Sequence, residues 1–132
     1  MLKGNCFENS LRFIVDESLD NPKRKLTLVH ATVTGTKGYV EGEKYSHAFV
    51  IERIVYEKLP GIQIGDPYID IAIDVSRDYN NPFAAPLDLY RDIGNVHNEV
   101  HYCLEEARHM LHLHENFGPW DDRETDFERK FA

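Results

Sequence analysis

Cysteine is scarce in this sequence, and long apolar runs are missing from it. The 132 residues include two cysteines, Cys6 and Cys103, which are too few for a disulfide-stabilised scaffold. No apolar run approaches the roughly 20 residues that a membrane-spanning helix needs. Polar residues follow Lys3, where an export signal would have its apolar segment. We therefore expect a cytoplasmic protein with reduced thiols and no membrane partner.

Positive charge is also in short supply. Lysine and arginine number 15 against 23 aspartates and glutamates, which gives a formal net charge of −8 at pH 7. Binding to nucleic acid needs a basic surface, so we expect no nucleic-acid partner. The hydrophobic fraction of 42% suffices for the core of one domain. We place this domain at residues 1–120 and a charged tail at residues 121–132.

The hydrophobic patterning predicts an α+β fold. Apolar residues spaced by three and four from Phe7 to Leu19 predict an amphipathic helix. Runs rich in β-branched residues predict strands, and the short loops between them favour an antiparallel sheet. These strands span residues 26–34, 46–55 and 69–75, and they are followed by a short helix at 87–91, an edge strand at 100–102 and a C-terminal helix at 104–114. Prolines 82 and 86 indicate a break in regular structure.

Three residues suited to acyl transfer lie at the edges of these elements. Cys6 falls in the first turn of the first helix, where Asn5 is a suitable N-cap and the helix N-terminus favours a thiolate. His47 opens one strand and Asp74 closes another. If these strands are neighbours, His47 and Asp74 share a face, and a helix packed over that face brings Cys6 against His47. The pattern predicts Cys6 as nucleophile, His47 as general acid and base, and Asp74 as the group that orients the imidazole.

Four short motifs are spread over residues 4 to 120. They are Gly4-Asn5-Cys6, His47-Ala48-Phe49-Val50, Ile73-Asp74-Val75 and Gly118-Pro119-Trp120. Together they resemble the papain-like and transglutaminase-like cysteine superfamily, and more narrowly small phage and bacterial proteins of that kind. The resemblance implies a helix that carries the thiol and packs on an antiparallel sheet. It also implies the triad Cys6, His47 and Asp74.

The resemblance leaves the oxyanion donor and the reaction open. Papain has a glutamine upstream of its cysteine as oxyanion donor, and no glutamine precedes Cys6 here. The backbone N–H of Cys6 and the side chain of Asn5 are the candidate donors. Strand phase and loop position place His30 and Tyr90 at the cleft. We expect hydrolysis of an amide or isopeptide bond in a peptide or protein, through a thioester and without a cofactor; deamidation and amine transfer use the same chemistry.

A metal site is a second interpretation. His97 and His101 are four residues apart, so on a helix they would share a face and could bind one metal ion. The third ligand would be one of the nearby glutamates Glu99, Glu105 and Glu115. The spacing is not that of the H-E-x-x-H metalloprotease motif, and we assign no metal ligand.

A third interpretation is a non-enzymatic protein that binds a partner, as an inhibitor does, with an incidental cysteine. Tyrosines are common in binding hot spots and could line the contact surface; here they include Tyr39, Tyr45, Tyr68, Tyr79 and Tyr90. The orienting carboxylate is also open, because Asp66 and Asp70 are alternatives to Asp74. The sequence does not indicate an oligomeric state.

Overall fold

The structure is a computed structural model of the chain, and it describes residues 6–35, 41–56, 67–76 and 78–121. Its elements are, in chain order, α1 (Cys6–Asp20), β1 (Lys25–Thr34), β2 (Lys44–Val55), β3 (Tyr68–Asp74), β4 (Phe83–Pro86), α2 (Leu87–Gly94), β5 (His97–Tyr102) and α3 (Leu104–His114). The predicted α+β class is confirmed: an N-terminal helix accompanies an antiparallel sheet and further helices. No helix in these ranges is long and apolar enough to cross a bilayer.

The five strands form one sheet in the order β4-β3-β2-β1-β5, with every neighbouring pair antiparallel. The central strand β2 pairs with β1 from Lys44 to Arg53. Its pairing with β3 is shorter and runs only from Val50 to Val55. Among the described residues, positions 44–49 of β2 therefore pair with β1 alone. This leaves one edge of β2 accessible to α1 next to the end of β3.

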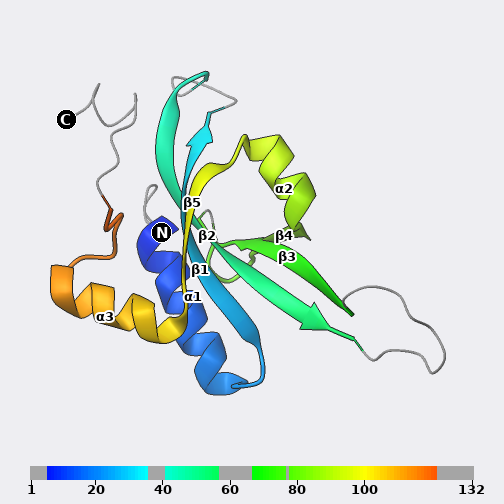
Figure 1. Cartoon of the computed structure of the whole chain (residues 1–132), viewed down its shortest axis with the longest axis vertical. Coiled ribbons are helices and arrows are strands. Elements are labelled where there is room, and N and C mark those ends of the chain that lie inside the picture. Colours follow the sequence, from blue (N-terminus) through cyan, green and yellow to red (C-terminus); the bar gives the residue numbers. More distant parts are fainter. Residues whose placement is uncertain (1–5, 36–40, 57–66, 77, 122–132) are drawn as a thin grey trace.

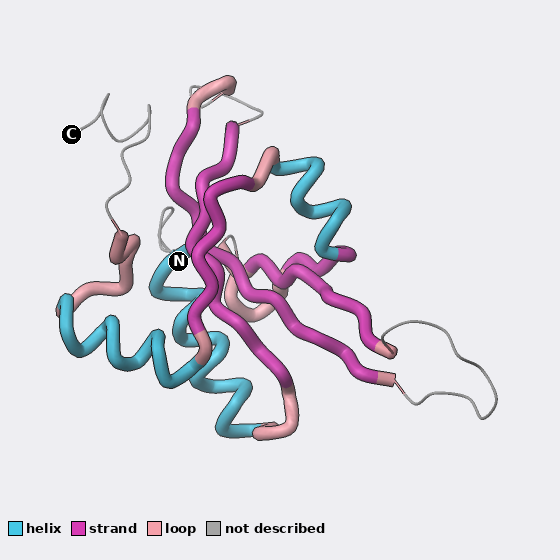
Figure 2. The backbone as a smooth tube through the Cα atoms, viewed as in Figure 1, coloured by secondary structure: helices cyan, strands magenta, loops and turns pink. Residues whose placement is uncertain are grey.

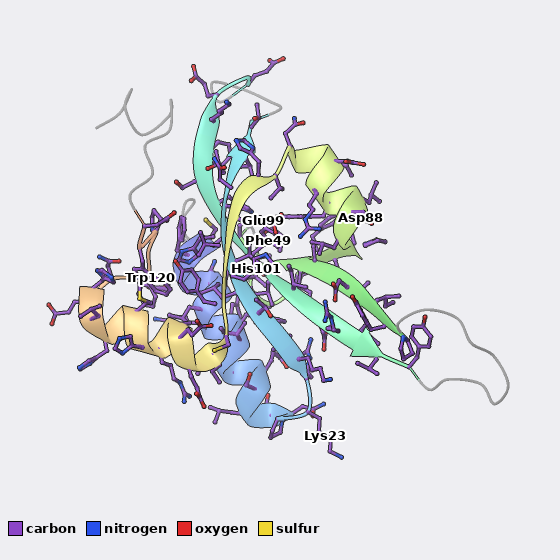
Figure 3. All side chains as sticks on the ribbon, viewed as in Figure 1. Lys23, Phe49, Asp88, Glu99, His101 and Trp120 are labelled. Carbon is purple, nitrogen blue, oxygen red and sulfur yellow. The ribbon has the colours of Figure 1, made fainter. Side chains whose placement is uncertain are left out.

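Helices cover both faces of the sheet (Figures 1 and 2). On one side lie α1 and α3, and on the other lies α2. Alternation along the strands sorts the side chains between these layers. Leu28 and Val50 pack with α1 and α3, whereas Val29 and Phe49 pack with Leu87 at the start of α2. Trp120 accordingly lies beside α1 and α3, and Asp88 lies on the opposite side (Figure 3).

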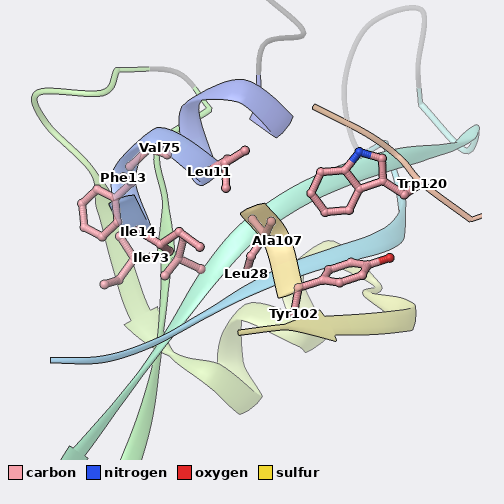
Figure 4. Packing of buried hydrophobic residues seen from close by; sticks show 10 residues of the cluster. Leu11, Phe13, Ile14, Leu28, Ile73, Val75, Tyr102, Ala107 and Trp120 are labelled. Carbon is pink, nitrogen blue, oxygen red and sulfur yellow. The ribbon is translucent and has the colours of Figure 1, made fainter. Parts of the chain in front are cut away.

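The larger core lies between the sheet and the α1–α3 layer (Figure 4). Its buried members are Leu11, Phe13, Ile14, Leu28, Val50, Ile73, Val75, Tyr102, Ala107 and Trp120. Full burial of a large apolar side chain contributes about 1.5–3 kcal/mol, so this cluster fixes α1 firmly on the sheet. The position of Cys6 is set by the same packing, because it is the first residue of α1.

The Gly-Pro-Trp motif closes this core. Gly118 has φ +108°, a conformation that residues with side chains rarely adopt. A Cβ atom there would come within 2.5 Å of Cε1 of His30. The His30 ring in turn contacts the ring of Trp120, with centroids 4.7 Å apart. The motif therefore has a packing role in this fold.

Three elements differ from those predicted by three residues or more, and one of them is α2, which ends at Gly94 rather than at residue 91. The segment Phe83–Pro86 was expected to be a break, but it forms β4 at the edge of the sheet. Pro86 is the last residue of that edge strand, where a missing N–H is tolerated. Strand β5 begins at His97 rather than at residue 100. Residues 122–132 of the predicted tail lie outside the described residues.

Candidate active site

The candidate site forms where β3 ends beside the first half of β2. Nε2 of His47 lies 2.9 Å from Oδ2 of Asp74, and their side chains are only 13% and 16% exposed. The regular pairing of the two strands stops just before this point, at Val50 and Ile73. The strands are therefore neighbours, and both side chains lie on the face that α2 covers.

Asp74 is held as a carboxylate by several donors. Its Oδ1 accepts hydrogen bonds from the backbone N–H of Ser76 at 2.9 Å and from Oγ of Ser76 at 2.5 Å. Its Oδ2 accepts one from the hydroxyl of Tyr90 at 2.6 Å. Burial raises the pKa of Asp74, but the interactions with His47, Ser76 and Tyr90 outweigh it and hold the pKa well below its ordinary value. Asp74 is therefore charged at neutral pH.

The imidazole of His47 also interacts with Cys6. Burial lowers the pKa of His47, but hydrogen bonds with Asp74 and Cys6 and the charges of both groups raise it to about 10. Asp74 and Tyr90 both lie at Nε2, so Nδ1 is the ring nitrogen that neither of them contacts. An imidazole held in this way can accept the thiol proton and remain protonated beside the sulfur.

The position of α1 that brings Cys6 next to His47 differs from the predicted one. We expected α1 to pack over the face that carries His47, but the body of α1 packs on the opposite face. Among the described residues, none pairs with positions 44–49 of β2 on the β3 side, and Cys6 at the start of α1 interacts there with His47. Nδ2 of Asn9 donates to the carbonyl oxygen of Val75 at 3.3 Å and ties α1 to the end of β3. Cys6 is 6% exposed there.

Tyr90 has a closer connection to the site than the cleft position predicted for it. Its hydroxyl donates to Asp74 and lies 3.1 Å from Nε2 of His47. Its ring packs on Phe49, with centroids 4.7 Å apart. Burial and the charge of Asp74 raise the pKa of Tyr90, so the hydroxyl stays protonated and remains a donor. No sequence signal connects a tyrosine on α2 to Asp74.

A cavity of about 520 Å³ adjoins His47, Asp74 and Tyr90. His30 does not line it. The His30 ring is fully buried on the other face of the sheet, where its centroid is 4.8 Å from that of Phe7. Of the two residues expected at the cleft, the structure places Tyr90 in the cavity wall and His30 in the core.

The other candidate residues lie elsewhere. Asn5 and Asp66 fall outside the described residues. Asp70 is opposite Arg53 in the sheet and binds its guanidinium, with Nε to Oδ1 at 2.9 Å and Nη2 to Oδ2 at 3.1 Å. Asp74 is thus the aspartate that the structure brings to His47.

His97 and His101 do not have the arrangement that the metal-site interpretation assumed. His97 and His101 lie on strand β5, not on a helix. Four residues along a strand span about 13 Å, too far for one ion. His101 instead has Nε2 2.9 Å from Oε1 of Glu99. In the part of the chain that the structure describes, no group of three or more histidine, cysteine, aspartate or glutamate side chains could hold a metal ion.

Comparisons with known proteins give no match to a protein-family model, to a curated protein or to a solved structure. A thiol at a helix N-terminus, an imidazole and a buried carboxylate in series form the arrangement that activates a sulfur nucleophile. The same arrangement supplies an acid for the leaving group.

Proposed function

We propose that this chain is a cysteine-dependent hydrolase or acyl transferase that acts on an amide or isopeptide bond in a peptide or protein. The observation that supports it is the ring of His47, which interacts with Cys6 and, through Nε2, with the carboxylate of Asp74 at 2.9 Å. An imidazole that interacts with both a thiol and a charged carboxylate has the partners that thiol catalysis needs.

The proposed reaction begins with transfer of the Cys6 proton to Nδ1 of His47. The sulfur attacks the carbonyl carbon, and the C–N bond then breaks as His47 returns the proton to the leaving amine. Water, deprotonated by His47, attacks the thioester and the C–S bond breaks, which regenerates the thiol. Asp74 keeps the imidazole oriented and stabilises its charged form. The free N–H groups of the first turn of α1, including that of Cys6, are candidate donors to the oxyanion.

Site-resolved alkylation tests the proposal. The protein is treated with iodoacetamide between pH 5 and 9, and the rates at Cys6 and Cys103 are read separately by peptide mass spectrometry. We expect Cys6 to react well below neutral pH, where ordinary thiols slow down. His47→Ala should slow Cys6 at pH 7 on the order of 100-fold, because the thiolate loses its cationic partner.

His101→Ala is the matched control, because His101 pairs with Glu99 on β5 and is not part of the site. This variant should leave the rate at Cys6 unchanged. Circular dichroism and thermal unfolding verify that both variants are folded. A rate at Cys6 that has the same pH profile as Cys103 and is unaffected by His47→Ala would contradict the proposed function.

A partner-binding role without catalysis is the second candidate. It is favoured by large apolar side chains exposed at the outer ends of β2 and β3, namely Ile54, Val55, Tyr56 and Ile69, with exposed fractions of 44–53%. Ile54 and Ile69 are cross-strand neighbours on one face of the sheet, and Val55 lies on the other face. An ordinary thiol at Cys6 in the alkylation experiment would favour this candidate over the enzyme.

A further inference from the structure

Asn9 places a buried amide near the start of the helix that carries Cys6. It is 6% exposed and lies three residues after Cys6, so both side chains are on one side of α1. Its Nδ2 donates to the carbonyl oxygen of Val75 at 3.3 Å. A carbonyl oxygen only accepts hydrogen bonds, so the amide nitrogen is the atom that must face it. A buried polar side chain therefore connects the start of α1 to the end of β3.

That carbonyl belongs to a peptide group that also holds Asp74. The C=O of Val75 and the N–H of Ser76 form one planar unit. The Ser76 N–H donates to Oδ1 of Asp74 at 2.9 Å, while Oδ2 of the same carboxylate lies 2.9 Å from Nε2 of His47. The imidazole in turn interacts with Cys6. A continuous chain of contacts therefore runs from the thiol through the imidazole, the carboxylate and the peptide group to the helix that carries the thiol.

The amide is bound at the point where β2 and β3 cease to pair. The N–H of Tyr56 donates to the carbonyl oxygen of Pro67 at 2.9 Å. In the register of this strand pair, every second residue of β3, and Val75 after it, therefore directs its backbone polar groups toward β2. Continuation of the register would place Val75 opposite Ala48, but among the described residues the regular pairing ends before these positions. The Asn9 amide supplies a donor at this point.

Apolar packing holds the body of α1 but fixes its first turn less closely. Leu11 and Phe13 of α1 lie in the larger core together with Val75 (Figure 4), and hydrophobic contacts of this kind are not directional. Helix ends fray, and Cys6 is the first residue of α1. A hydrogen bond has a preferred distance and angle, so the Asn9 amide restricts the first turn to one position against β3.

We propose that Asn9 is a positioning residue for the thiol, because its amide docks the first turn of α1 on the end of β3 and keeps the sulfur of Cys6 in contact with the imidazole. Proton transfer needs the two groups within hydrogen-bond reach, and a displacement of about 1 Å can slow catalysis on the order of 100-fold. Asp74 keeps its own donors Ser76 and Tyr90, so loss of the amide acts through Cys6. This inference rests on the proposed function and names a contact that maintains its nucleophile.

The pH profile of alkylation tests this role. Asn9→Ala should slow the reaction of iodoacetamide with Cys6 about tenfold at pH 7, because the thiol loses contact with the imidazolium and its pKa rises. The difference should fall below about twofold at pH 9, where both proteins carry a thiolate. A general loosening of the structure would instead change the rate at every pH. Asn9→Gln keeps an amide donor and should recover most of the lost rate.

Ile14→Val is the matched control. Ile14 is fully buried on the same helix, and loss of one methyl group weakens its packing without removing the amide. This variant should unfold at a lower urea concentration, but its rates at Cys6 should match those of the wild-type protein from pH 5 to 9. Equal profiles for Asn9→Ala and the wild-type protein, or equal effects of Asn9→Ala and Ile14→Val, would overturn the inference. A wild-type Cys6 that reacts well below neutral pH would still leave the proposed function intact.

Titration of the His47 ring separates this inference from the chemistry. Nuclear magnetic resonance measures the midpoint, which the contact with Cys6 raises. Asn9→Ala should lower it by about one pH unit, but should change it little in Cys6→Ser, because the thiol through which Asn9 acts is absent. If wild-type Cys6 reacts as an ordinary thiol, the proposed function fails, but this titration still decides the role of Asn9. A midpoint that does not move in Asn9→Ala, or that moves equally in the Cys6→Ser background, would overturn the inference.

Discussion

The two cysteines both lie at the N-terminus of a helix, yet their surroundings differ. Cys6 is the first residue of α1, is 6% exposed and interacts with His47. Cys103 is the N-cap of α3 and is exposed. Its Sγ accepts a hydrogen bond from the N–H of Glu106 at 3.5 Å, and its own N–H donates to Oε1 of Glu106 at 2.9 Å. One thiol interacts with an imidazole, and the other caps a helix.

The comparison indicates that a position at a helix N-terminus does not by itself distinguish Cys6 from Cys103. Backbone N–H groups favour a thiolate at both positions. At α3, however, Glu105 and Glu106 occupy the first turn, and a hydrogen bond from the backbone of Cys103 lowers the pKa of Glu106 and keeps it charged. A thiolate at Cys103 would face like charge. The imidazole of His47 is therefore the feature that distinguishes Cys6.

Among variants that keep His47, the largest expected effect comes from removing the charge behind its imidazole. Asp74→Asn should slow iodoacetamide alkylation of Cys6 at pH 7 about 30-fold, because an amide neither stabilises the imidazolium nor fixes the same tautomer. Cys103 should react as before and serves as the internal reference. Asp70→Asn, which loses only the pair with Arg53, should leave both rates unchanged. Equal rates at Cys6 in the two variants would remove Asp74 from the proposed triad.

The same charges predict how stability depends on pH. The pKa of His47 is raised from 6.5 to about 10, so its contribution is complete below pH 6.5 and is lost as the pH rises through about 10. The pKa of Asp74 is lowered from 3.8, so its contribution is present above pH 3.8 and is lost as the pH falls further. The free energy of unfolding in urea should drop by on the order of 2 kcal/mol between pH 6.5 and 10.

Variants at Asp74 and at the two cysteines test whether His47 causes this decline in stability. Asp74→Asn and Cys6→Ser each remove a group that raises the pKa of His47, so both should flatten the decline above pH 6.5. Cys103→Ser should leave the decline unchanged. A decline that persists in Asp74→Asn would mean that other groups cause it.

Tyr90→Phe should have a smaller effect on the same thiol. It removes one donor from Asp74 but keeps the ring on Phe49. We expect alkylation of Cys6 at pH 7 to slow about fivefold, less than a full hydrogen bond to a charged group would give, because Ser76 still donates to Asp74. Tyr79→Phe is the control, because the Tyr79 hydroxyl binds Asp16 away from the site. An equal effect of both variants would argue against a positioning role for Tyr90.

Periodicity predicted most of the fold because long amphipathic segments depend mainly on local sequence. Helices α1 and α3 and strands β1, β2 and β3 lie where their patterns placed them. Strand β4 was missed because Pro82 and Pro86 resemble chain breaks. An edge strand needs only one partner, and here β3 supplies it.

The residues of the site could be predicted from the sequence, but the way in which Cys6 comes next to His47 could not. The placement of His47 and Asp74 at strand edges follows from patterning, and their contact follows once β2 and β3 pair. The face of the sheet on which α1 packs is set by tertiary contacts of its apolar side chains, which no local motif encodes. Asp74 also caps the turn at Ser76, using one carboxylate oxygen for that turn and the other for His47.

The smallest expected effect lies at the second cysteine and concerns stability alone. Cys103→Ala removes the side-chain half of the capping box of α3 and should lower the free energy of unfolding by about 0.5–1 kcal/mol. Cys103→Ser keeps an acceptor for the N–H of Glu106, and serine is a preferred N-cap, so stability should be retained. Urea unfolding at pH 7 measures both, and neither variant should alter alkylation of Cys6. A slower Cys6 in Cys103→Ala would mean that the end of α3 and the start of α1 are coupled, and the two cysteines could no longer be treated as independent sites.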